Sequence, residues 1–127
     1  MNTVAVRLIM DVGPDKVVAL ATKLGIDAPL RSEPSLALGT SEVSLLDLTG
    51  AYGAFASGGS VVEPHIIRRI RSSTGRVLYA RPAPSGDTVV APASVAALNG
   101  MLQTVVQAGT GKRAGLAGHA TAGKTGT

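Results

Sequence analysis

Apolar residues recur every three or four positions in four stretches of the chain, and this spacing predicts four helices. The stretches cover residues 3–12, 14–24, 41–57 and 92–105. Pro14 and Pro92 each stand at the start of a stretch, where proline is favoured in the first helical turn. Gly13 and Gly25 follow the first two stretches and are typical of helix ends.

The third helix carries the most regular apolar stripe. Thr40 or Ser41 is the expected N-cap, which places Glu42 in the first turn, where the helix dipole favours an anion. The stripe consists of Leu45, Leu48, Tyr52 and Phe55. Gly50 and Gly53 interrupt this helix, although each costs about 1 kcal/mol relative to alanine in a helix interior. We therefore expect close packing of these two glycines against a neighbouring element.

Two extended runs, residues 65–72 and 76–80, flank Ser73-Thr74-Gly75 and predict a β-hairpin. The remaining segments, 26–40, 81–91 and 109–118, are rich in glycine or proline and predict connections. The expected fold class is α+β, with helices outnumbering strands.

Composition narrows the possible functions. Hydrophobic residues make up 45% of the 127 residues, so a core is available, and the net charge is +4 with five arginines between positions 68 and 81. Aromatic residues are only 2%, however, which disfavours stacking on nucleic-acid bases, and we expect no nucleic-acid partner. The chain has no cysteine, and its two histidines are far apart, so we expect neither a metal nor a cofactor. No apolar run is long enough to span a membrane.

The last ten residues combine small side chains with a single cation, Lys124. Residues Gly118 to Thr125 match the letters of a phosphate-binding P-loop, G-x-x-x-x-G-K-T. A P-loop needs a buried strand before it and a helix after it. Here the preceding residues are Gly-rich and basic, and the chain ends shortly after Lys124, so a nucleotide-binding module is the weaker alternative. The same residues also contain Lys-Thr-Gly-Thr, the third motif of penicillin-binding proteins and β-lactamases.

The chain resembles the transpeptidase domain of class A penicillin-binding proteins along essentially its whole length. The segments that carry the resemblance occur in the family's order: residues 2–8 (the end of S-x-N and the following helix), 37–59, Pro64 with the basic hairpin, 109–111 and 122–127. A departure occurs at Ser44-Leu45, where relatives often carry Thr-Pro. The resemblance implies that residues 1–127 are a partial transpeptidase domain, mostly helical, with a hairpin and part of a central antiparallel sheet.

The family's enzymes use a serine to attack the penultimate D-Ala of a peptidoglycan stem peptide, and the acyl-enzyme then passes to an amine. The resemblance implies stem peptides ending in D-Ala-D-Ala and β-lactams as partners, and a location on the outer, periplasmic face of the bacterial cytoplasmic membrane. A D,D-carboxypeptidase or a β-lactam sensor of the same fold remains an alternative.

The resemblance also implies roles for individual residues. Lys124 should hold the substrate's carboxylate, with hydrogen bonds from the hydroxyls of Thr125 and Thr127. The backbone N–H of Thr127 should serve as an oxyanion-hole donor. Gly126 should leave a strand edge open to substrate, and Asn2 should contact the substrate's peptide amide.

The family's nucleophile lies in a Ser-x-x-Lys motif, and no serine of the 127 residues stands three positions before a lysine. We therefore expect the chain to be inactive alone and to need the remainder of a parent chain. We also expect the apolar faces that contain Leu45, Leu48 and Val105 to be exposed, and the isolated chain to self-associate.

Overall fold

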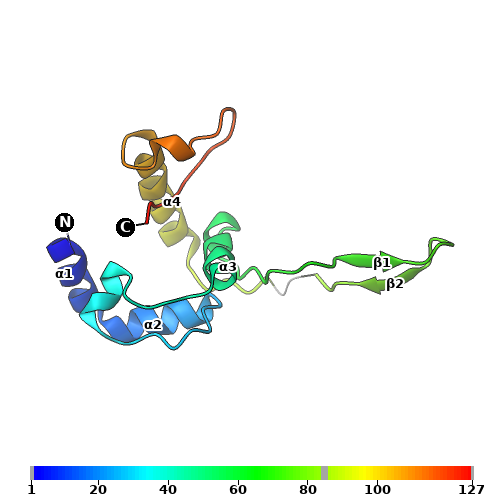
Figure 1. Ribbon diagram of the computed structural model, residues 1–127, viewed down its shortest axis with the longest axis horizontal. Helices are drawn as coiled ribbons and strands as arrows, with labels where there is room; N and C mark the ends of the chain where they lie inside the picture. The colour runs from blue at the N-terminus through cyan, green and yellow to red at the C-terminus, as the bar shows by residue number, and fades with distance from the viewer. Residues whose placement is uncertain (1, 84–85, 127) are drawn as a thin grey trace. The chain divides into compact units, whose positions relative to one another are not determined.

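The computed structural model describes residues 2–83 and 86–126 (Figure 1). The chain forms two compact units, Met1–Val89 and Val90–Thr127. The first unit contains three α-helices, a short 3-10 helix and a two-stranded hairpin, and the second contains one α-helix and a short 3-10 helix.

The first two helices have nearly the predicted bounds: α1 spans Asn2–Val12 and α2 spans Pro14–Lys23. After α2 the chain turns back, and the N–H of Ile26 donates to the carbonyl of Ala21 at 3.1 Å. Leu24 and Ile26 are buried, as is Ile9 of α1. The long connection that follows contains an unpredicted 3-10 helix, η1 (Pro34–Leu38), which lies against α1.

The third helix, α3 (Leu45–Ala56), begins later than predicted. Its N-cap is Ser44, whose Oγ accepts a hydrogen bond of 3.0 Å from the N–H of Asp47. Ser44 has the required extended backbone, and Asp47 rather than Glu42 is the acidic residue of the first turn. The prediction of Thr40 or Ser41 as the cap was wrong, because the helical hydrogen bonds start only with the N–H of Leu48 donating to the carbonyl of Ser44.

The cap can be tested by a matched pair of serine substitutions. Ser44→Ala removes the acceptor for the Asp47 N–H and should lower the free energy of unfolding by about 1 kcal/mol. Ser41→Ala, three residues earlier, should change it by less than about 0.5 kcal/mol, because Ser41 caps no helix. Urea unfolding followed by circular dichroism measures both. A larger loss in Ser41→Ala than in Ser44→Ala would contradict the observed helix start.

The two glycines of α3 lie against the returning chain, as predicted. A Cβ atom on Gly50 would be 3.2 Å from Cγ of Pro64, and one on Gly53 would be 3.3 Å from Cβ of Val62. The buried residues of α3 are Gly50, Ala51 and Ala54. The face of α3 that packs is therefore the one with small residues. It is not the predicted apolar stripe, whose leucines are Leu45 and Leu48, and which we call the leucine stripe.

The leucine stripe of α3 is largely open to solvent, as expected. The side chains of Leu45 and Leu48 are exposed, Leu45 to 80%. In the second unit, the expected exposure of Val105 is only partial, since this residue is half-buried.

The two segments of the hairpin are paired beyond the ends of its two strands. Strand β1 (Arg69–Arg71) pairs antiparallel with β2 (Val77–Ala80), with an irregularity between Ile70 and Arg71. A second pairing, between Ser60 and Thr88, joins the two chain segments near α3. We call residues 59–83 and 86–89 the arm, with its root at the Ser60–Thr88 bridge and its tip at the turn before Arg76.

The strands of the arm are shorter than the predicted 65–72 and 76–80. The ladder ends where the N–H of Arg81 donates to the carbonyl of Arg68 at 2.9 Å. All residues of both strands are exposed.

The second unit is built on α4 (Pro92–Gln107), which starts at the predicted proline. Val95 and Val106 are its buried residues, whereas Met101 is exposed. The 3-10 helix η2 (Lys112–Ala114) lies against α4. Across the described residues the structure has four α-helices and one two-stranded antiparallel sheet, which agrees with the predicted α+β class.

Candidate functional site

A tight Gly-Thr-Gly turn follows the C-terminal end of α4. The N–H groups of Gly109 and Gly111 donate to the carbonyl of Val105 at 3.1 and 2.9 Å. A Cβ atom on Gly109 would be 2.9 Å from both Cα and O of Val105, and one on Gly111 would be 3.2 Å from that oxygen. The turn therefore has no room for a side chain at Gly109 and little at Gly111, and Thr110 between them is exposed.

The C-terminal segment is attached to the same helix. The N–H of Gly123 donates to the carbonyl of Leu102 in α4 at 3.2 Å. Upstream, Oγ1 of Thr121 accepts a hydrogen bond from the N–H of Leu116 and donates one to the carbonyl of His119, both at 3.3 Å. Residues 120–126 run beside α4 without forming a strand or helix (Figure 1).

These two anchored segments bring two hydroxyl groups together. Oγ1 of Thr110 and Oγ1 of Thr125 lie 2.9 Å apart and share a hydrogen bond, although 15 positions separate them in sequence. Nζ of Lys124 donates to the carbonyl of Thr125 at 2.8 Å. All three residues are exposed. The cluster of Lys124, Thr110 and Thr125 therefore presents one ammonium group and two hydroxyls to solvent, a donor set suited to a carboxylate.

The sequence missed Thr110 as a member of this site. Its segment was part of the family resemblance, but no role was assigned to its hydroxyl. A hydroxyl side chain between two glycines was the available signal, because small neighbours leave such a group accessible.

The roles predicted for Gly126, Asn2 and Thr127 are not tested by the described contacts. Gly126 is exposed and has no atom within 4 Å of an added Cβ, but no strand is formed around it in the described residues, so the open strand edge stays a prediction. Asn2 is exposed at the start of α1 and belongs to the first unit, whereas the Lys124 segment belongs to the second. Thr127 lies outside the described residues. The roles of Asn2 and Thr127 therefore stay predictions.

The P-loop alternative finds no support in the backbone. The residues that precede Gly118 form η2 and turns, not a strand. The strand that a P-loop requires before its glycine-rich turn is therefore absent from the described residues that precede Gly118.

The described residues, 2–83 and 86–126, contain no group of three acidic or histidine side chains that could hold a metal ion. In the same residues no helix is both long and apolar enough to cross a lipid bilayer.

Comparison with known proteins agrees with the motif order. The family model described as the penicillin-binding protein transpeptidase domain matches residues 1–127. Penicillin-binding protein 1A of Aquifex aeolicus is 39% identical over the whole chain, which covers 17% of that protein. Penicillin-binding protein 2D of Bacillus subtilis is 41% identical over 64% of the chain, which corresponds to 12% of that protein.

A solved structure shares the fold. The D,D-transpeptidase domain of a peptidoglycan glycosyltransferase from Eggerthella lenta superposes with a TM-score of 0.77 at 25% identity, over 99% of this chain and 39% of that one. The chain thus spans less than a fifth of the two full-length relatives named above and less than half of this domain structure. With the family model matched from the first residue to the last, the chain belongs to the transpeptidase domain family of the penicillin-binding proteins.

Proposed function

We propose that this chain supplies the carboxylate-binding part of a serine-type D,D-transpeptidase that crosslinks peptidoglycan stem peptides. The observation that carries the proposal is the 2.9 Å hydroxyl pair of Thr110 and Thr125 next to Lys124. The hydrogen bond joins two segments of the family's motif order, 109–111 and 124–126, in one small site.

The negative charge of the substrate's terminal carboxylate determines how the site would bind it. A stem peptide ends in a D-Ala carboxylate, which the Lys124 ammonium attracts and the hydroxyls of Thr110 and Thr125 orient by hydrogen bonds. A serine attacks the carbonyl carbon of the penultimate D-Ala, the peptide bond breaks, and the terminal D-Ala leaves with a proton on its amine. An amine of a second strand then attacks the acyl-serine ester, which forms the crosslink and restores the serine hydroxyl.

Two further residues belong to the proposal without structural support. The N–H of Thr127 would stabilise the oxyanion of the tetrahedral intermediate. Asn2 would bind the peptide amide of the substrate. A β-lactam, which carries a carboxylate beside its reactive carbonyl, would occupy the same groups and acylate the serine.

The reactive serine is proposed to come from the rest of a longer parent chain. The 127 residues contain no Ser-x-x-Lys sequence, so residues 1–127 are proposed as a partial transpeptidase domain that is inactive alone. The proposed location is the outer face of the bacterial cytoplasmic membrane. Self-association of the isolated chain through the exposed Leu45 and Leu48 face is part of the same proposal.

A chimeric enzyme tests the proposal. The 127 residues would replace the matching segment of penicillin-binding protein 1A of Aquifex aeolicus, which is 39% identical to them. We expect the chimera to be labelled covalently by fluorescent penicillin, because that protein supplies the missing serine region and this chain supplies the carboxylate site. The isolated 127-residue chain should gain no penicillin mass in mass spectrometry.

Two outcomes would contradict the proposal. A chimera that unfolds cooperatively but takes no label would show that this segment does not support acylation. A penicillin adduct on the isolated chain would show that one of its own serines is the nucleophile.

A further inference from the structure

Strand β1 of the arm has one edge without a partner strand. In the described residues the sheet consists of β1 and β2 alone, and every residue of both strands is exposed. A sheet of two strands is only marginally stable in water, and its edges present backbone N–H and C=O groups to which another strand can pair. The free edge of β1 is therefore a candidate site for an added strand.

The hydrogen bonds of the hairpin show which backbone groups of β1 face this free edge. The carbonyl of Arg68 and the N–H of Ser72 both form hydrogen bonds with the other segment of the hairpin, at 2.9 and 2.8 Å. In an antiparallel pair, the backbone groups of every second residue point toward the partner strand. Arg68, Ile70 and Ser72 therefore face the other segment. The N–H and C=O groups of Arg69 and Arg71 point to the free edge.

The side chains of Arg69 and Arg71 lie on one face of the hairpin, because residues two positions apart in a strand share a face. The irregularity of the register adds Leu78 to β2 and leaves the alternation of β1 intact. The cross-strand partners of the two arginines, Ala80 and Val77, carry no charge. In the described residues neither guanidinium group has an ion pair or a hydrogen bond. A carboxylate opposite each arginine on an added strand would stabilise the sheet.

The middle residue of β1 completes the pattern that an added strand must match. Ile70 lies on the opposite face from the two arginines and pairs with Tyr79, and each of these two side chains is 43% exposed. An apolar residue between two acidic ones on the added strand would lie beside Ile70 and cover part of this pair. The strand that fits β1 therefore has the order acidic, apolar, acidic.

We propose that the free edge of β1 binds an extended acidic segment of a partner protein, which adds to the sheet as a third strand. Backbone hydrogen bonds to Arg69 and Arg71 supply affinity, and the alternation of charged and apolar side chains supplies specificity. The surface belongs to the arm and shares no residue with the cluster of Lys124, Thr110 and Thr125.

The charge and the open backbone of β1 together favour this partner over two others. A second copy of β1, paired antiparallel about Ile70, would place arginine opposite arginine, which destabilises a sheet. An anionic lipid surface would attract the guanidinium groups but would leave the outward N–H and C=O groups of the edge without strand partners. An acidic extended segment satisfies both the charges and the backbone.

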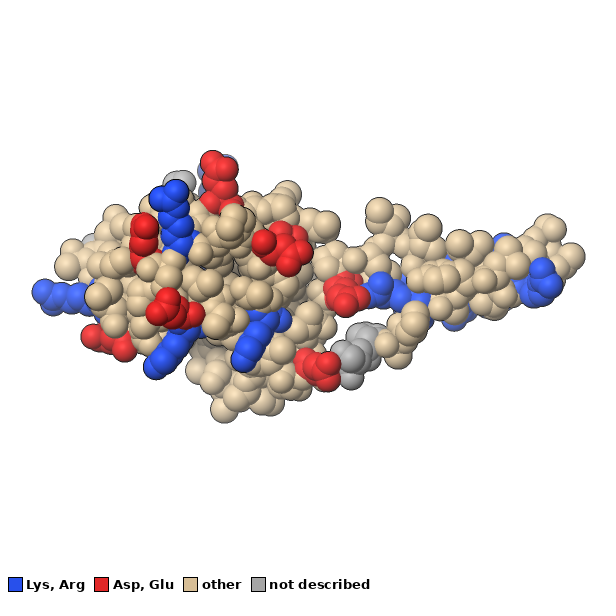
Figure 2. All heavy atoms as spheres, turned by 90° about the horizontal axis from the view of Figure 1, so that it is seen from below, with Lys and Arg blue, Asp and Glu red and all other residues tan. Residues whose placement is uncertain are grey.

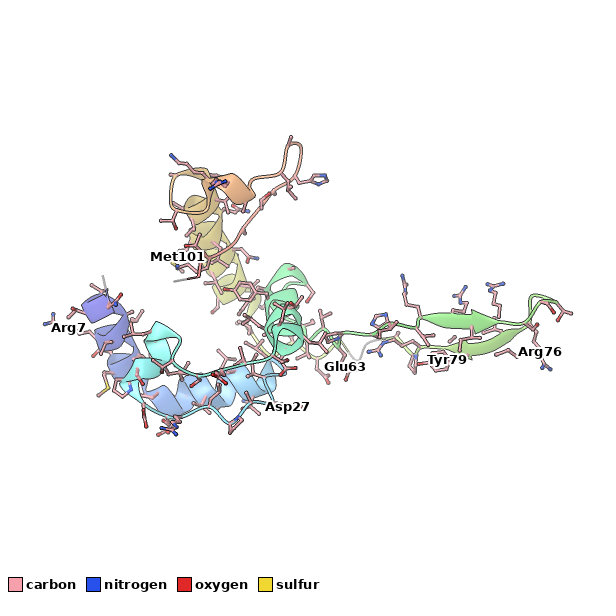
Figure 3. The ribbon with its side chains drawn as sticks, in the orientation of Figure 1. Arg7, Asp27, Glu63, Arg76, Tyr79 and Met101 are labelled. Atoms are coloured by element: carbon pink, nitrogen blue, oxygen red, sulfur yellow. The ribbon has the colours of Figure 1, made fainter. Side chains whose placement is uncertain are left out.

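The arm also offers a matched control residue. On the face shown in Figure 2, basic atoms continue along the arm to its tip, whereas acidic atoms lie toward its root. Arg76 lies at the tip, away from Glu63 (Figure 3), and is not part of β1. It therefore has the same charge, on the same hairpin, outside the proposed surface.

The test is an NMR titration of the isotope-labelled full chain with the peptide acetyl-Thr-Thr-Glu-Ile-Glu-Thr-Thr-amide. We expect a one-to-one complex in which hydrogen exchange at the N–H groups of Arg69 and Arg71 slows, because these groups acquire partners. The control peptide, acetyl-Thr-Thr-Glu-Glu-Ile-Thr-Thr-amide, has the same composition and charge, but its two glutamates lie on opposite faces of a strand. Its Kd should be higher by about fivefold, because one charge pair is lost.

Charge reversal in the chain provides the second part of the test. The double substitution Arg69→Glu with Arg71→Glu should raise the Kd of the first peptide by about tenfold or more, since two attractive pairs become repulsive. Arg76→Glu should change it less than about twofold, because an exposed charge outside the pairing acts weakly. The double variant should instead bind a peptide with lysine in place of both glutamates more tightly than the unaltered chain does. A misfolded variant would not show this gain.

Four results overturn the proposal. The first is no binding of the acidic peptide. The second is equal binding of the two acidic peptides, or an equal loss in Arg76→Glu, either of which would mean diffuse attraction to a basic hairpin. The third is unchanged exchange at Arg69 and Arg71 in the complex, which would mean that only side chains bind the anion, as on a lipid surface. The fourth is slowed exchange at the same two residues when the chain is concentrated without peptide, which would assign the edge to a second copy.

Discussion

Lys124→Ala in the chimeric enzyme is expected to lower the second-order rate constant of penicillin acylation by about 100- to 1,000-fold. The proposed reason is electrostatic. The ammonium group attracts the carboxylate of the β-lactam and holds its carbonyl in place, and loss of one such preorganised donor from an active site costs this much in other enzymes. The rate constant is measured from the growth of fluorescent label on the protein with time at several penicillin concentrations.

The control for this substitution is Lys112→Ala. Lys112 lies in η2, also exposed and also in the second unit, but it makes no hydrogen bond to Thr125. Its loss changes the net charge by the same amount and should change the rate constant less than about threefold, because charge alone acts weakly at an exposed position. Equal losses in the two variants would assign the effect to net charge and would remove Lys124 from the proposed site.

Thr125 takes part in the site through both its hydroxyl and its carbonyl. In the structure its Oγ1 is held by Thr110, and its carbonyl accepts a hydrogen bond from Lys124. The ammonium group is therefore oriented by the backbone of the residue whose hydroxyl shares the site. This coupling is a reason to expect that the site depends on the turn at Gly109–Gly111 as well as on the Lys-Thr-Gly segment.

Much of the helical framework was predictable from the sequence. Prolines at the first helical turn mark the starts of α2 and α4, and Gly13 and Gly25 mark helix ends, because both residue types act through the local backbone alone. The same local reasoning was wrong at α3. Thr40, Ser41 and Ser44 are all suitable caps by residue type, and only the path of the chain decides that Ser44 fills the role.

Packing was harder to predict than helix position. The leucine stripe of α3 has the spacing of a core face, but the residues that pack are Gly50, Ala51 and Ala54, since the chain returns along the small-residue side through Val62 and Pro64. No local pattern reveals which face the returning chain will cover. The paired strands are likewise shorter than predicted, since the pairing ends at the hydrogen bond from the N–H of Arg81 to the carbonyl of Arg68.

The site was predictable only in part. Lys124, Thr125 and Gly126 follow from a short motif supported by the order of the other segments. The contribution of Thr110 depends on a hydrogen bond across 15 positions, and that contact forms because α4 holds both the turn after its end and Gly123. Spacing in sequence carries no information about such a contact.

The turn itself provides the second large expected effect. Gly109→Ala should lower the free energy of local opening at the end of α4 by about 1–3 kcal/mol, because the new Cβ would lie 2.9 Å from Cα and O of Val105, and backbone must move to relieve the overlap. The N–H of Gly111, which donates to the carbonyl of Val105 at 2.9 Å, reports on this opening. Its hydrogen exchange, measured by NMR, should accelerate by about 5- to 150-fold.

Gly100→Ala is the matched control in the same helix. An added Cβ there has no atom within 4 Å, so the substitution should stabilise α4 by up to about 1 kcal/mol through helix propensity and slow the exchange of its amides. The two alanine variants are therefore expected to differ in sign. In the chimera, Gly109→Ala should also slow penicillin acylation, since the displaced turn carries Thr110 away from Thr125, whereas Gly100→Ala should not. Unchanged exchange at Gly111 in Gly109→Ala would mean that the turn has room for a side chain, and the two threonine hydroxyls would then not depend on the glycine for their contact.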